Sequence, residues 1–144
     1  MSTNSSIGRS SHEESSFVRN KLIEYNAKHV PDDLKSNYEE INLVIKSNDG
    51  VIIGGLNSVF CWNWIEVDIL WVDETCRGMN YGSKLLHEIE EIARAKKCTF
   101  IKLNTFSFQA PAFYIKQGYQ VIGTIENAPR GCTHYYYKKD IQGE

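Results

Sequence analysis

The segment from Val72 to Ser83 carries the residues of this chain that are best suited to binding an anionic group. Arg77 is followed by two glycines and an asparagine, at Gly78, Asn80 and Gly82. Glycine and asparagine let the backbone bend and present its N–H groups, and arginine offers planar donors that match phosphate oxygens. The helical pattern that follows adds a helix N-terminus, with about half a positive charge. The segment therefore predicts a phosphate-binding loop, and an ordinary strand-to-helix turn is the alternative.

The spacing of the glycines argues against the two common nucleotide-binding motifs. Gly78 and Gly82 lie four positions apart, and Ser83 and Lys84 follow the second glycine, so neither GxxxxGK[ST] nor GxGxxG is present. No nearby acidic cluster indicates a magnesium site. The loop thus fits a pyrophosphate that backbone amides hold without a metal.

A second motif, from Ser107 to Tyr119, favours the phosphate-binding loop over an ordinary strand-to-helix turn. Together with the loop it resembles the GNAT superfamily of N-acetyltransferases. Members bind acetyl-CoA through an Arg/Gln-x-x-Gly-x-Gly/Ala loop and often carry Asn-x-x-Ala-x-x-Phe/Leu-Tyr-x-x-x-Gly-Phe/Tyr downstream. The positions that match the second motif are Ala110, Phe113, Tyr114, Gly118 and Tyr119. The resemblance covers roughly residues 41–125, and the chain is diffusely similar to bacterial streptothricin-type acetyltransferases.

Two positions depart from the family pattern. Asn80 stands where the family usually has the first glycine of the loop, and asparagine is the residue other than glycine that best tolerates a left-handed backbone. Ser107 stands where a CoA-contacting asparagine is common, and its hydroxyl has a shorter reach. The resemblance implies cofactor contacts at Leu70, Trp71, Val72, Arg77, Gly78, Met79, Asn80, Tyr81, Gly82, Ser83 and Ser107.

The resemblance also implies direct transfer of an acetyl group from acetyl-CoA, as co-substrate, to an amine. The backbone of Leu70, Trp71 and Val72 would hold the pantetheine arm. Tyr114 matches the family's usual acid, and a tyrosine with an ordinary pKa near 10 can protonate a thiolate whose thiol has a pKa near 8.5. A core tyrosine on a short helix is the alternative for Tyr114.

The attacking amine must be neutral, so a base should take its proton. Glu66 and Asp68 lie two apart on one predicted strand and should share a face, where family members often place an acidic base. A solvent-facing strand edge is the alternative, and His134 is a lesser candidate. Aromatic residues near predicted strand ends could line the acceptor pocket and favour a cationic amine, although core or dimer packing explains most of them more simply: Trp62, Trp64, Phe106, Phe108 and Tyr135–Tyr137.

The elements that must position these residues follow from hydrophobic periodicity. Helices are predicted over 13–27, 81–97 and 110–117, and strands over 41–45, 51–60, 64–72, 99–106, 119–125 and 133–139. In the second helix, Glu90 and Arg94 have i,i+4 spacing suited to an ion pair. The strands at 64–72 and 99–106 should be parallel, because a helix connects them.

These elements predict an α/β fold of the GNAT type. Its mixed sheet has antiparallel N-terminal strands and a parallel central pair, flanked by helices. We expect one N-acetyltransferase domain over 1–144, with residues 1–12 as a frayed tail or, alternatively, with a weak first strand around Ser5–Ser10.

Composition narrows the function further. The net charge of −2 does not indicate a nucleic-acid-binding surface or a polybasic membrane anchor. No apolar run approaches the roughly 18 residues of a membrane span. The four cysteines form no CxxC pair, so neither a metal site nor a disulfide framework is expected. The N-terminus lacks a secretory pattern, which favours a cytoplasmic location.

The sequence as a whole predicts an enzyme that acts on a small-molecule amine. A homodimer is possible. The alternative functions are a CoA-binding regulatory module and a protein or peptide N-acetyltransferase.

Overall fold

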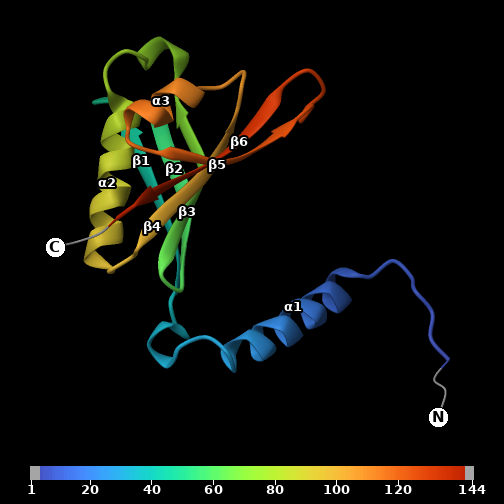
Figure 1. Cartoon of the computed structure of the whole chain (residues 1–144). Coiled ribbons are helices and arrows are strands. Elements are labelled where there is room, and N and C mark those ends of the chain that lie inside the picture. The colour runs from blue at the N-terminus through green and yellow to red at the C-terminus, as the bar shows by residue number, and fades with distance from the viewer. Residues whose placement is uncertain (1–3, 142–144) are drawn as a thin grey trace. The chain divides into compact units, whose positions relative to one another are not determined.

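The computed structural model describes residues 4–141, and the chain divides into two compact units, Met1–Ser36 and Asn37–Glu144. The first unit holds helix α1 (His12–Ala27) and a short 3-10 helix, η1 (Asp32–Leu34) (Figure 1). Residues 4–11 form no helix or strand, and residues 1–3 of the predicted tail lie outside the described residues. That the whole chain acts as one domain stays a prediction.

Helix α1 confirms the helix predicted over 13–27. It begins at a capping box, in which the Ser11 hydroxyl accepts a hydrogen bond from the Glu14 amide and the Glu14 carboxylate accepts one from the Ser11 amide. Each bond satisfies an amide that the helix leaves without a partner, which fixes the first turn. None of the residues of α1 is buried.

The second unit is built on a six-stranded sheet in the order β1-β2-β3-β4-β6-β5. The strands β3 and β4 are parallel and all other neighbours are antiparallel, which confirms the predicted mixed α/β fold. Its elements are β1 (Tyr38–Lys46), β2 (Ile52–Cys61), β3 (Trp64–Val72), η2 (Glu74–Cys76), α2 (Tyr81–Ala95), β4 (Phe100–Phe106), α3 (Pro111–Lys116), β5 (Gln120–Glu126) and β6 (Thr133–Asp140).

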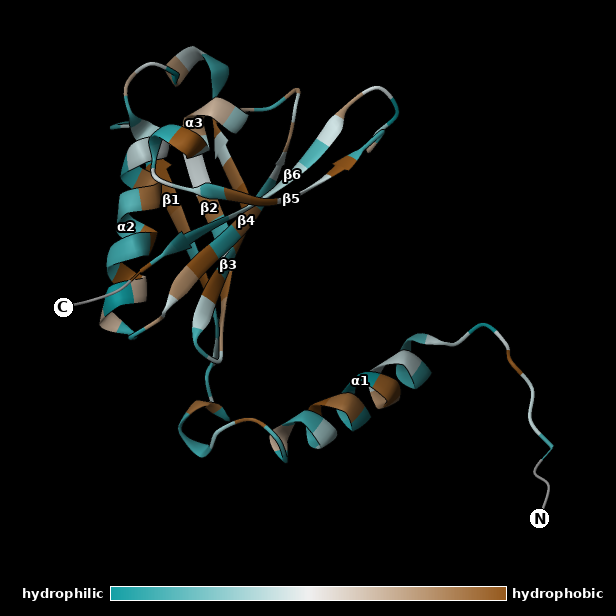
Figure 2. Ribbon diagram, in the orientation of Figure 1, coloured by the Kyte–Doolittle hydropathy of each residue, from teal (hydrophilic) through white to brown (hydrophobic). Residues whose placement is uncertain are grey.

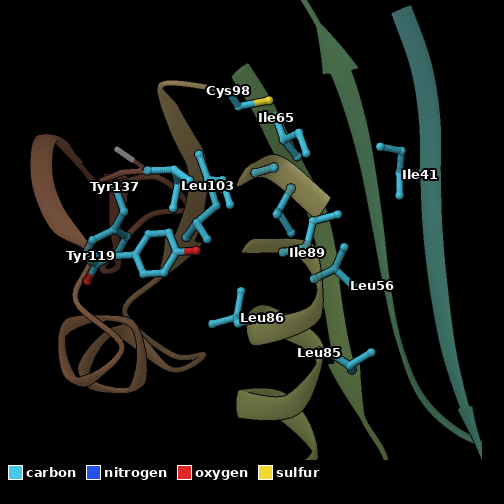
Figure 3. Packing of buried hydrophobic residues seen from close by; sticks show 14 of the residues in the cluster. Ile41, Leu56, Ile65, Leu85, Leu86, Ile89, Cys98, Leu103, Tyr119 and Tyr137 are labelled. Atoms are coloured by element: carbon cyan, nitrogen blue, oxygen red, sulfur yellow. The ribbon is translucent and has the colours of Figure 1, made fainter. Parts of the chain in front are cut away.

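The core lies between helix α2 and one face of the sheet. Leu86, Ile89 and Ala93 recur at helical spacing on α2 and are fully buried. They pack against strand side chains such as Leu56 and Ile65, as Figure 3 shows from close by. In Figure 2 the central strands are largely hydrophobic, whereas the outer side of α2 is hydrophilic. Each fully buried aliphatic side chain contributes about 1.5–3 kcal/mol, so this contact holds α2 in place.

The parallel pair of strands separates partway along its length. The register of β3 with β4 runs from Trp64↔Phe100 to Val67↔Leu103 and includes no later pair of the described strands. On the other side of β3, Ser58 pairs with Val67 but Asn57 pairs with Ile69, which leaves Asp68 as an extra residue. Such a bulge bends a strand and increases its local twist. Beyond Asp68, β3 therefore turns an unpaired backbone edge towards β4.

The predicted ion pair between Glu90 and Arg94 is wrong. Arg94 pairs with the exposed Glu91 at 2.6 Å, while Glu90 lies on the buried side of α2, where Arg94 does not reach. There Glu90 accepts a hydrogen bond from the Tyr119 hydroxyl at 3.1 Å and lies 3.2 Å from Lys139 Nζ. Burial, together with the charge of Glu90, raises the pKa of Tyr119, so this hydroxyl stays a donor. The cluster ties α2 to β6 and to the segment between α3 and β5.

Replacing Glu90 by Gln should destabilise the protein by about 2 kcal/mol, because Lys139 then lacks its carboxylate partner inside the structure. Glu91→Gln is the matched control, since it breaks an exposed pair on the same helix that is worth about 0–1 kcal/mol. Chemical unfolding of both variants measures the two values. Equal losses would show that Glu90 and Lys139 contribute no more than a surface pair.

Candidate active site

A cavity of about 800 Å³ opens where β3 and β4 separate. Its walls are the second half of β3, the loop and first turn of α2, the end of β4 with the turn that follows, and α3. In Figure 1 these elements meet at the upper end of the sheet. The cavity brings together the predicted phosphate-binding loop, Asp68 and Tyr114, which the sequence alone places far apart.

One end of the cavity is suited to an anion. Arg77 Nε donates a hydrogen bond to the Val72 carbonyl at 3.2 Å, which holds the guanidinium beside the end of β3. Gly78 and Asn80 both have left-handed backbones, with φ of 89° and 62°. The geometry predicted for Asn80 is thus confirmed.

Helix α2 begins without the caps that α1 has. The Asn80 side chain makes no capping hydrogen bond, and the first turn of α2 holds no acidic residue. Asn80 has a left-handed backbone, whereas an N-cap residue usually has an extended one. In the described part of the chain, the amides of this turn are therefore free to bind an anionic ligand. The positive end of the helix dipole also favours a negative charge there.

Gly82 allows α3 to pack closely against this first turn. A Cβ at Gly82 would lie 3.1 Å from Phe113 Cζ, a contact tighter than most real side chains make. Gln117 Nε2 also donates a hydrogen bond to Ser83 Oγ at 2.9 Å. Gly82 is thus needed for a close approach rather than for an unusual backbone angle, and the contact fixes the position of α3 at the cavity.

Tyr114 of α3 is buried, with 8% of its surface exposed, and it lines the cavity. Its ring packs near those of Tyr119 and Tyr137 at centroid distances of 6.1 and 5.8 Å. Burial, assisted by Tyr137, raises the pKa of Tyr114 to about 12. Among the described residues its hydroxyl has no hydrogen-bond partner, and no fully buried side-chain polar atom lacks one, so the hydroxyl is accessible on a residue that lines the cavity. Tyr114 is therefore a proton-bearing donor at neutral pH.

The two predicted carboxylates do not lie together. Asp68 lines the cavity, whereas Glu66 is outside it and lies 3.7 Å from Lys102 of β4. The two-residue alternation of a strand would put both on one face, but the bulge at Asp68 interrupts it. The structure thus brings Asp68, and not Glu66, into the cavity that Tyr114 lines.

Three other predicted candidates lie outside the cavity lining. Met79 is exposed at the surface of the loop. The Ser107 hydroxyl accepts a hydrogen bond from the Thr133 amide at 3.0 Å, so it joins the end of β4 to β6. His134 Nε2 lies 3.0 Å from Asn104 Oδ1 on the next strand. The other predicted loop and strand residues, from Leu70 to Val72 and at Arg77, Gly78 and Asn80–Ser83, all line the cavity.

Several lining residues were missed by sequence reasoning. Asn104 and Lys116 line the cavity, and the Gln109 side chain holds the turn after β4 by accepting hydrogen bonds from the Phe106 amide and the Thr105 hydroxyl at 2.9 and 3.0 Å. Lys116 could have been found as a cation two positions after Tyr114. Asn104 gives no such signal, because only the separation of the strands exposes it to the cavity.

Residues 4–141 hold no group of three or more His, Cys, Asp or Glu side chains that could bind a metal ion. None of their helices has both the length and the apolar character of a membrane-crossing segment.

Comparison with known proteins identifies the family. Residues 11–119 match the model of the Acetyltransferase (GNAT) family. Blasticidin-S acetyltransferase of Streptomyces morookaense is 38% identical over 93 residues, which cover 64% of this chain and 68% of that protein. The crystal structure of an acetyltransferase from Bacillus cereus is 41% identical, covers 94% of this chain and 97% of that chain, and gives a TM-score of 0.90.

A more distant structure shares the fold. It is a Bacillus anthracis protein described as a streptothricin acetyltransferase in complex with acetyl coenzyme A. It is 19% identical, covers 78% of this chain and 69% of that chain, and gives a TM-score of 0.65. The chain belongs to the GNAT family and is an acetyltransferase.

Replacing Asn80 by Ala should destabilise the protein by about 1 kcal/mol, because alanine tolerates the left-handed backbone poorly. Asn80→Gly is the matched control and should be neutral within about 0.5 kcal/mol, since glycine adopts that backbone freely. Denaturant unfolding of the two variants measures both values. If the two substitutions cost the same, the asparagine side chain rather than its backbone geometry stabilises the loop.

Proposed function

We propose that this protein moves an acetyl group from acetyl-CoA directly to a primary amine of a small molecule. One observation carries the proposal: a single cavity holds an anion-binding loop, a carboxylate and a buried tyrosine hydroxyl beside the unpaired edge of a strand. Membership of an acetyltransferase family supports the reaction class. The small-molecule acceptor is supported by the name of the blasticidin-S relative.

Acetyl-CoA fits the charges and the backbone of the cavity. The donors of Arg77 and the uncapped amides of α2 suit its pyrophosphate. The unpaired edge of β3 offers N–H and C=O groups to the amides of the pantetheine arm, much as a neighbouring strand would use them. Acetyl-CoA supplies a thioester carbon that an amine can attack.

Asp68 is the proposed base. It is the one carboxylate among the described residues that line the cavity, where Arg77 and Lys116 supply the positive charges. Its negative charge attracts a cationic amine, and its oxygen accepts a proton from that amine, so that the neutral nitrogen can attack the thioester carbon. The nitrogen loses its second proton to solvent once the N–C bond has formed. The C–S bond then breaks, and the electron pair leaves with the sulfur.

Tyr114 is proposed to stabilise the departing sulfur. Its pKa is raised to about 12, whereas a thiol has a pKa near 8.5. Complete proton transfer from the tyrosine would be uphill by about 5 kcal/mol at that difference. We therefore propose that Tyr114 donates a hydrogen bond to the developing thiolate, and that the thiolate is protonated from solvent at release.

Blasticidin S and streptothricin are the first acceptors to test, because relatives and structural neighbours carry their names. The cytoplasmic location and the homodimer remain predictions from the sequence. Free-thiol release from acetyl-CoA across a panel of amines tests the proposed reaction, and no release with any amine would contradict it.

Replacing Tyr114 by Phe should lower kcat about 10²-fold and leave the KM for acetyl-CoA within about twofold, because the hydroxyl acts only as the sulfur departs. The ring and its packing survive in this variant, so a loss of stability is not expected to explain the result. The thiol-release assay measures both constants. An unchanged kcat would make Tyr114 a structural residue.

Asp68→Asn and Glu66→Gln form a matched pair that decides between the two predicted carboxylates. Asp68→Asn should lower kcat/KM for the amine about 10²-fold, because the amide cannot accept the proton. Glu66→Gln removes a charge of the same sign from the same strand and should change kcat/KM by less than about threefold, since Glu66 lies outside the cavity. The reverse pattern would assign the base to Glu66.

A further inference from the structure

A row of stacked aromatic rings extends from the cavity across β4 and β6. It consists of Phe108, Phe106, His134 and Tyr136, and we call it the aromatic row. Successive ring centroids lie 5.4, 4.2 and 4.5 Å apart, and the first two pairs are nearly parallel, with interplanar angles of 8° and 18°. Phe106 and His134 are direct partners in the strand register, so they share a face of the sheet.

The hydrophobic core does not explain the aromatic row. The other face of these strands carries the buried side chains, such as Leu103 and Tyr137. By contrast, Phe108 is 63% exposed and Tyr136 is 36% exposed. Large apolar rings that stay in water at a cavity mouth gain free energy when a ligand covers them.

The rings are also held in place before any ligand arrives. The His134 ring is fixed by its 3.0 Å contact with the Asn104 side chain. The turn that carries Phe108 is fixed by Gln109, whose side chain accepts a hydrogen bond from the Phe106 amide at 2.9 Å. A preorganised surface of this kind binds with less loss of conformational entropy than a flexible one.

The aromatic row begins at the chemical centre. Phe106 and Phe108 line the same cavity as Asp68 and Tyr114. The cationic residues of the lining, Arg77 and Lys116, belong to the loop before α2 and to α3, whereas the aromatic row belongs to β4, the turn after it and β6. An acceptor whose amine lies at Asp68 therefore has the aromatic rings available for the rest of its structure.

We propose that the aromatic row is an acceptor subsite for a flat conjugated group joined to the reacting amine by a short chain. Flat groups stack on aromatic faces, and a cationic flat group gains a further attraction to the rings. The inference rests on the proposed function, because it says where the part of the amine substrate beyond the reacting nitrogen binds. Heteroaromatic rings and guanidinium groups share this chemistry, and the experiment separates them.

The test compares amines of matched size in the thiol-release assay. Benzylamine is flat, cyclohexylmethylamine is its puckered counterpart, and agmatine carries a guanidinium group. We expect kcat/KM for benzylamine to exceed that for cyclohexylmethylamine by about tenfold, with the difference in KM. If agmatine exceeds both, the subsite favours guanidinium over a neutral ring. Equal values for the three amines would overturn the proposal.

Phe108→Leu keeps an apolar side chain at the cavity but removes the aromatic face. It should reduce the preference for benzylamine over cyclohexylmethylamine to less than about threefold, because only the flat amine loses a stacking partner. Phe100→Leu is the matched control, because Phe100 lies on the same face, stacks on Trp64 and is not part of the cavity lining. Equal losses for both amines in Phe108→Leu would mean that the ring only packs, and would overturn the subsite.

Two further readouts keep the subsite separable from the proposed reaction. If no amine releases thiol, calorimetric binding of the amines to the protein with CoA still reports on the subsite. Tighter binding of benzylamine than of cyclohexylmethylamine supports it, and equal or absent binding overturns it. If Phe108→Leu instead halves the molecular mass in solution and leaves amine preference unchanged, the aromatic row is an interface with a second copy, which also overturns the proposal.

Discussion

The separation of β3 from β4 is the constraint on which the rest of this structure depends. If β3 and β4 stayed paired along their whole length, there would be no opening between them. Their facing backbone N–H and C=O groups would then all be hydrogen-bonded to each other. Here the pairing stops after Val67↔Leu103, and the bulge at Asp68 bends β3 away. The sheet thereby gains a cavity with a polar backbone edge inside it, and the residues proposed to do chemistry are those that meet at this opening.

Helices α2 and α3 keep the opening in shape. α2 is held by its buried apolar side and begins at the cavity, so its uncapped first turn points its amides at the same space. α3 reaches that turn through the close contact of Gly82 with Phe113, and this contact sets the position of Tyr114. The buried carboxylate of Glu90 binds Tyr119 and Lys139, and the Tyr119 ring packs near Tyr114, so this stabilising cluster adjoins the residue proposed to act on the sulfur.

The sequence predicted much of this because many of the signals are local. Hydrophobic periodicity placed β3 at the residues that the structure shows and α2 within two residues of its observed end. The tolerance of asparagine for a left-handed backbone correctly described Asn80. The motif that contains Tyr114 led to a buried residue at the cavity, although its catalytic role stays a proposal.

Other features depend on strand partners, which one segment of sequence does not reveal. The alternation rule put Glu66 and Asp68 together, but the register of β2 with β3 creates the bulge that separates them. Arg94 lies at a suitable spacing from Glu90, yet the side of α2 that faces the sheet gives Glu90 other partners. The position of Ser107 next to β6, where its hydroxyl binds Thr133, likewise follows only from the strand order.

The central claim is that the opening between β3 and β4 receives acetyl-CoA. Titration of the isotopically labelled protein with acetyl-CoA, followed through the backbone amide NMR signals, tests it most directly. The account predicts that the largest shifts fall on residues 70–72 of β3 and on residues 77–83 at the start of α2. Shifts confined to β1 and β2, or no shifts at millimolar acetyl-CoA, would contradict it.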